Sequence, residues 1–149
     1  MAVSIYIPLD PHLVKYMERE AMRRNGTYKA VKTSFFGNYV LGALENMPEG
    51  ERPGAPDCSH LVFQIPDRYA ESHGNWMSPR NRDLISTWIR KDYEKEFMLF
   101  VRENHLKWGL SYLQGIEKWR ERYGITENIR KFETDQRYFT RKKSPQKLS

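Results

Sequence analysis

The residues best suited to chemistry stand near the end of the chain, in a segment that the pattern predicts as a short helix, residues 132–142. Phe132 and Phe139 are seven positions apart and therefore share one side of that helix. Four residues fall roughly on the other side: Thr134, Arg137, Tyr138 and Arg141. Arginine can bond a guanine edge or a phosphate, and threonine can bond a phosphate. The spacing is therefore typical of a nucleic-acid contact.

Positive charge is concentrated in the second half of the chain. Residues 1–70 carry 8 Lys and Arg against 8 Asp and Glu, whereas residues 71–149 carry 17 against 11, which accounts for the whole net charge of +6. Such an excess attracts polyanions by counterion release, and we expect duplex DNA as the favoured partner. The predicted contacts are Arg130, Thr134, Arg137, Arg141, Lys142 and Lys143. Alternatively, the basic end is a solvated tail that aids solubility.

Two further helices are predicted before this segment. Ser78 and Pro79 give a cap and a first-turn proline to a long helix that reaches about residue 105, with Gly109 as its stop. A second helix, residues 111–123, ends at Gly124. Three helices with a basic last member resemble a helix-turn-helix unit in outline, although the link after Gly124 is longer than the usual turn.

The first half predicts a small lobe of strands and helices. Alternating apolar residues predict strands at residues 3–7 and 61–65, and we expect them to pair. Between them, helical periodicity covers residues 11–24 and a segment from Thr33 or Ser34 to residue 47. The lobe is therefore predicted as β-α-α-β.

These segments together predict an α+β, mostly α chain. We expect an N-terminal lobe over residues 1–70, a basic helical module over residues 78–143 and a frayed tail over residues 144–149. The proline- and glycine-rich stretch at residues 48–57 is the best candidate for a lobe boundary.

Several function classes find no support in the pattern. The sequence has no glycine-rich phosphate loop, no G-x-S-x-G and no H-E-x-x-H, so we expect no enzyme, no catalytic residue and no cofactor. Cys58 and His60 do not have the spacing of a zinc finger, and no metal site is expected. A single cysteine fits a reducing compartment, and the sequence has neither an apolar run that could cross a bilayer nor a signal peptide. We therefore expect a cytoplasmic protein with no membrane partner.

Two stretches resemble uncharacterised small proteins of bacterial phages and integrating mobile elements. The first runs Ile5-Tyr6-Ile7-Pro8-Leu9-Asp10-Pro11-His12-Leu13, and the second runs from Gly115-Ile116 through Tyr123-Gly124-Ile125 to Arg137-Tyr138-Phe139-Thr140-Arg141. The resemblance implies a DNA-binding accessory or regulatory protein of a mobile element, for example in transcription regulation. It carries over no functional residues.

Two other functions stay open. One is a protein-interaction or virion-associated role without nucleic acid, and homo-oligomers are also possible, although no heptad seam marks an interface. The other is binding of RNA or single-stranded DNA, in which Trp76 or Trp108 would stack on bases.

Overall fold

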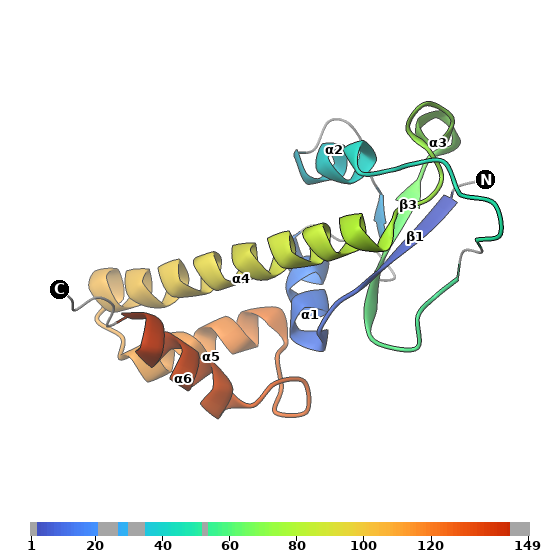
Figure 1. The fold of residues 1–149 in the computed structure, drawn as a ribbon. Helices are drawn as coiled ribbons and strands as arrows, with labels where there is room; N and C mark the ends of the chain where they lie inside the picture. The colour runs from blue at the N-terminus through green and yellow to red at the C-terminus, as the bar shows by residue number, and fades with distance from the viewer. Residues whose placement is uncertain (1–2, 21–26, 30–34, 52–53, 144–149) are drawn as a thin grey trace. The chain divides into compact units, whose positions relative to one another are not determined.

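The computed structural model describes residues 3–20, 27–29, 35–51 and 54–143, and Figure 1 shows their elements. The elements in chain order are β1 (Val3–Pro8), α1 (Pro11–Glu20), β2 (Thr27–Lys29), α2 (Phe35–Gly42), β3 (His60–Ile65), α3 (Asp67–His73), α4 (Pro79–Trp108), α5 (Tyr112–Tyr123) and α6 (Phe132–Lys143). The prediction of an α+β, mostly α chain is confirmed. Among the described helices, none combines the length and the apolar character needed to cross a membrane.

The three strands form one sheet in the order β1-β3-β2. β1 and β3 are antiparallel, with Ile5 opposite Phe63 and Ile7 opposite Leu61, and all four side chains are buried because alternate residues of a strand face the same side. The predicted pairing of these two strands is confirmed. β2 lies parallel to β3 on its other side, so the observed order is β-α-β-α-β instead of β-α-α-β.

Two helices of this lobe differ from their predicted bounds. α2 ends at Gly42, five residues early, because the backbone of Glu45 pairs with that of Trp76 in an isolated bridge. Gly74 packs against this bridge with a φ of 120°, and a Cβ there would lie 2.3 Å from the Glu45 carbonyl oxygen, so only glycine fits. The sequence pattern is irregular from Tyr69 to Met77, with room for one helical turn at its start, and the structure has the short helix α3 there. Residues 21–24 and 33–34 of the predicted helices lie outside the described residues.

The long helix α4 begins at the predicted residue and ends at Trp108, about three residues after the predicted end and directly before the predicted stop Gly109. The Ser78 Oγ accepts a hydrogen bond from the Asn81 backbone N–H at 3.2 Å, which caps the helix start. Near this start Arg82 donates to two carbonyl oxygens at 2.8 Å, those of Met77 and Tyr6, and so ties α4 to β1. At the other end, Gly109 adopts a positive φ of 69° directly after the last helical residue.

The chain divides into two compact units, Met1–Ile89 and Arg90–Ser149. The division lies inside α4, whereas the sequence places it between residues 70 and 78 with the loop at residues 48–57 as the best boundary. That loop belongs to the first unit, because β3 follows it and pairs with β1. The first unit has 10 Lys and Arg against 10 Asp and Glu, and the second has 15 against nine, so the second unit carries the entire excess of +6.

Candidate nucleic-acid interface

An aromatic core holds the three helices of the second unit together. Tyr93 and Phe97 stand one turn apart on α4 and are buried, as are Trp119 of α5 and Phe139 of α6. The Phe97 ring centroid lies 5.6 Å from that of Trp119 and 6.3 Å from that of Phe139, in edge-to-face contacts. The Trp119 Nε1–H donates to the Tyr93 hydroxyl at 3.2 Å. α6 is therefore fixed against the core by the side that carries Phe139.

Both ends of α5 are closed by local bonds. Ser111 and Gln114 form a reciprocal capping box, with the Gln114 N–H bonded to Ser111 Oγ and the Ser111 N–H bonded to Gln114 Oε1. Gly124 takes the left-handed conformation at the end of the helix, as predicted. The chain that follows, residues 124–131, is twice as long as the three- or four-residue link of a helix-turn-helix.

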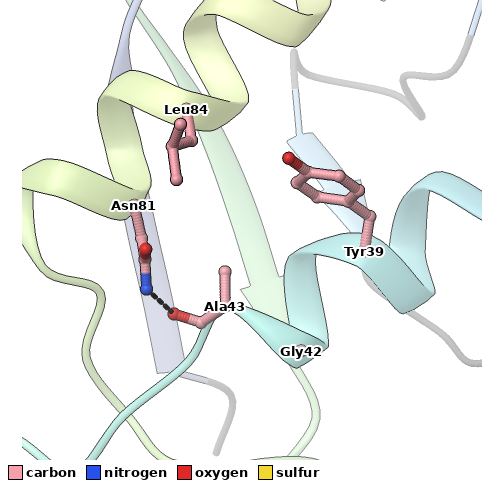
Figure 2. Close-up of a pocket in the computed structure, with 5 residues that line it drawn as sticks. All are labelled: Tyr39, Gly42, Ala43, Asn81 and Leu84. Atoms are coloured by element: carbon pink, nitrogen blue, oxygen red, sulfur yellow. Dashed lines mark hydrogen bonds between the residues drawn. The ribbon is translucent and has the colours of Figure 1, made fainter.

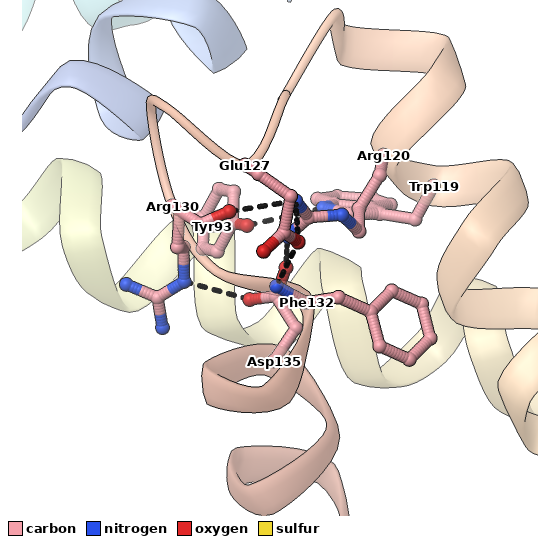
Figure 3. A network of polar contacts seen from close by, with 7 residues as sticks. All are labelled: Tyr93, Trp119, Arg120, Glu127, Arg130, Phe132 and Asp135. Atoms are coloured by element: carbon pink, nitrogen blue, oxygen red, sulfur yellow. Dashed lines mark hydrogen bonds and ion pairs between the residues drawn. The ribbon is translucent and has the colours of Figure 1, made fainter.

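A buried carboxylate organises this link. Asp135 is 1% exposed and accepts 2.7 Å ion-pair bonds from Arg120 Nη1 and from Arg130 Nε, as Figure 3 shows. Arg120 Nη2 also donates to the Arg130 carbonyl oxygen at 2.6 Å. At the start of α6, the Phe132 N–H donates a hydrogen bond to the Glu127 carboxylate at 2.7 Å. The network therefore sets the position at which α6 begins.

The hydroxyl groups of Tyr93 on α4 and Tyr138 on α6 have raised pKa values. Burial raises the pKa of Tyr93, and the nearby Asp135 carboxylate adds to that rise. Burial also raises the pKa of Tyr138, and Glu94, which bonds to its hydroxyl, adds to it. Both hydroxyls are therefore neutral at physiological pH.

The outer side of α6 carries most of the predicted contact residues. Thr134, Arg137, Arg141 and Lys142 are all exposed. Arg137 lies 3.3 Å from Glu133, an exposed pair that contributes little to stability. The guanidinium of Arg141 and the ammonium of Lys142 lie 5.7 and 5.8 Å from the Tyr138 ring centroid. Lys143 is the last residue of α6, and its side chain lies outside the described part of the chain.

Arg130 differs from the other predicted contacts. Its side chain is only 23% exposed and is engaged by the Asp135 carboxylate. The bond to Asp135 uses the Nε of Arg130 and holds this guanidinium at the start of α6. We therefore assign Arg130 a part in positioning α6, and its predicted phosphate contact stays a prediction.

Comparison with known protein families, with curated proteins and with solved structures finds no match. The resemblance to small phage proteins thus stays a prediction. The roles of individual residues rest on the geometry of this chain.

Sequence reasoning missed the two central members of the network. Arg120 and Asp135 are charged, and charged residues are rarely buried unless they are paired. A signal was nevertheless present, because Asp135 falls between Phe132 and Phe139 on the same side of α6. A carboxylate on the core side of a helix predicts a buried cationic partner.

Two hollows formed by described residues do not suit a phosphate. A groove of about 510 Å³ beside the network is lined by Glu117, Glu121 and Glu127. Its one cation, Arg120, is already paired with Glu127 and Asp135, so the groove is acidic. In the first unit, a hollow of about 350 Å³ lies beside α2 and the start of α4; Figure 2 shows Tyr39 and Leu84 at it and the 3.0 Å bond from Asn81 to the Ala43 carbonyl oxygen. Neither hollow presents cations that are free to bind an anion.

No group of three His, Cys, Asp or Glu side chains within the described ranges is arranged to hold a metal ion. Cys58 is exposed, and His60 bonds the Cys58 carbonyl oxygen at 2.9 Å through its ring nitrogen Nδ1.

Proposed function

We propose that the unit Arg90–Ser149 binds duplex DNA through the outer side of α6, as a DNA-binding accessory or regulatory protein of a mobile element. The observation that carries the proposal is the division of α6 into two sides. One side, with Asp135 and Phe139, is buried, and the other presents Thr134, Arg137 and Arg141 to solvent. A helix held rigidly on one side can offer the other to a groove without losing its own packing.

The residue types on this outer side fit a polyanion. Arg137 and Arg141 are one turn apart, and either guanidinium can bond two phosphate oxygens or the edge of a guanine. Lys142 and Lys143 add point charges suited to the backbone, and Thr134 adds a hydroxyl. α6 would then act as the recognition helix of a helix-turn-helix-like unit with an enlarged link.

Glu133 is the main opposing feature of this surface, since it pairs with Arg137. Exposed pairs of this kind contribute at most about 1 kcal/mol, and a phosphate can replace the carboxylate at little expense. The acidic groove at Glu117 and Glu121 would face away from the DNA, because like charges repel a phosphate backbone.

The test is fluorescence anisotropy of a labelled duplex, titrated with the protein at several salt concentrations. The double variant Arg137→Ala/Arg141→Ala should bind more weakly, and the slope of log affinity against log salt should fall by about 2 because two phosphate contacts are lost. The control Lys91→Ala/Lys95→Ala removes the same charge from exposed positions of α4 in the same unit. It should change the slope by less.

A second variant separates the helix from the tail. A chain that ends at Lys143 keeps all of α6 and should retain most of the duplex affinity. Loss of binding on this truncation, or equal affinities of the double variant and the wild type, would refute the role of α6.

A further inference from the structure

Beside the basic end of α6, the turn between α4 and α5 exposes large apolar side chains. Leu106 is 81% exposed, Trp108 is 73% exposed and Leu113 is 46% exposed. We refer to these three residues as the apolar tip. Large apolar side chains grouped at one end of a small unit usually mark a binding site.

The apolar tip is held in place before any ligand binds. The Gly109 N–H bonds to the His105 carbonyl oxygen at 3.1 Å, and His105 Nδ1 donates to the Leu110 carbonyl oxygen at 2.8 Å. The capping box at Ser111 starts α5 directly afterwards. Trp108 is therefore the last residue of a helix whose end is fixed, and little backbone entropy is lost when its ring is covered.

Ring contacts place the apolar tip near the cations of α6. Tyr112 lies 4.3 Å from His105 and 4.8 Å from Phe139, measured between ring centroids. Phe139 is two residues before Arg141. Figure 1 shows the same arrangement, with the turn after α4 and the final residues of α6 at one end of the unit. The apolar tip and the cationic end of α6 thus lie at the same end of the unit.

This combination selects among possible occupants. A second copy of the chain would bring another unit of net charge +6 to the same place and would be repelled. A DNA backbone matches the charge, and DNA-bending proteins commonly insert Leu or similar wedges between base steps. Trp108 offers a flat face on which an unpaired base can stack.

We infer that the apolar tip is a wedge for unpaired or unstacked bases, and that it gives the protein a preference for interrupted duplexes over continuous ones. The inference rests on the proposed function, because α6 supplies the contacts to the flanking phosphates. Trp108 stacks on the exposed base.

The experiment compares two labelled probes by anisotropy at one salt concentration: a continuous duplex and the same duplex with a central two-base bulge. The wild type should bind the bulged probe about tenfold more tightly, the order expected for one base stacked on an aromatic ring. Trp108→Ala should bring this ratio close to one and change the affinity for the continuous duplex by less than about twofold. Leu99→Ala, a matched control at an exposed leucine of α4 outside the tip, should leave the ratio unchanged.

The variants distinguish the two proposals. Arg137→Ala/Arg141→Ala should lower the affinity for both probes by the same factor and leave the ratio of the two affinities unchanged. Equal wild-type affinities for the two probes would overturn the wedge and leave duplex binding intact, whereas no binding to either probe would overturn both. Binding to vesicles of phosphatidylglycerol and phosphatidylcholine that Trp108→Ala abolishes, with an unchanged probe ratio, would assign the tip to a lipid surface and also overturn the wedge.

Discussion

The two ends of α6 use arginine in opposite ways. At the first end, Arg120 and Arg130 converge on the buried Asp135 and neutralise its charge. At the last end, Arg141 is exposed to solvent and lies over the ring of Tyr138. The difference teaches that a count of basic residues overstates the charge offered to a partner, because part of it neutralises an internal carboxylate.

The largest effect should come from Asp135→Asn. The substitution leaves two guanidiniums around a neutral amide, and breaking a buried ion pair in this way costs about 3–5 kcal/mol of unfolding free energy. Urea denaturation followed by circular dichroism measures the change. Glu133→Gln, an exposed acid two residues away, is the control and should change stability by about 0.5 kcal/mol or less. If both variants unfold at the same urea concentration, the buried Asp135 contributes no more to stability than the exposed Glu133.

A smaller effect should follow Tyr93→Phe, which removes the hydroxyl that accepts the bond from Trp119 Nε1. At neutral pH the expected loss is about 1 kcal/mol. Burial raises the pKa of Tyr93, so the folded chain retains this proton more strongly than the unfolded chain, whose tyrosine pKa is about 10. Wild-type stability should therefore fall as the pH rises above about 10.

Tyr93→Phe should lose less stability over this alkaline range, because the variant has no buried hydroxyl to ionise. Unfolding free energies measured at pH values on both sides of 10 give the comparison. Equal alkaline losses in the two proteins would show that Tyr93 ionises as easily in the folded chain as in the unfolded one.

The smallest effect on stability should come from Arg137→Ala. Its pair with Glu133 is exposed at both members, so the unfolding free energy should change by about 0.5 kcal/mol or less, while duplex affinity falls. Thermal melts and anisotropy on the same preparation test both statements. A destabilisation as large as that of Asp135→Asn would make the outer side of α6 structural and break the contrast between its two ends.

Much of the fold could be predicted from the spacing of apolar residues and from the cap residues at helix ends. The caps at Ser78 and Gly124 mark helix ends that the structure confirms, and the alternation around Ile5 and Phe63 identifies two strands that pair. β2 was not predicted because its three residues are too few to show an alternation of apolar and polar side chains. The division after Ile89 was not predicted because it lies inside a continuous helix, where the composition of the sequence does not change.

The candidate interface was predictable only in part. The exposed positions of Arg137 and Arg141 follow from their spacing relative to Phe139. The engagement of Arg130 depends on the path of the link before α6, which periodicity does not determine. Of the apolar tip, Trp108 was named from the sequence as a residue that could stack on bases, whereas the exposure of Leu106 and Leu113 was not predicted.

The pairing of β1 with β3 has a consequence for the order of folding. Ile7 and Leu61 are neighbours in the sheet but 54 positions apart in the chain, so their contact requires closure of a long loop. The contacts among α4, α5 and α6 join segments that are close in sequence and should form faster. During synthesis, the strand Val3–Pro8 leaves the ribosome well before its partner, and the backbone groups of its edge stay unpaired with β3 until residues 60–65 emerge.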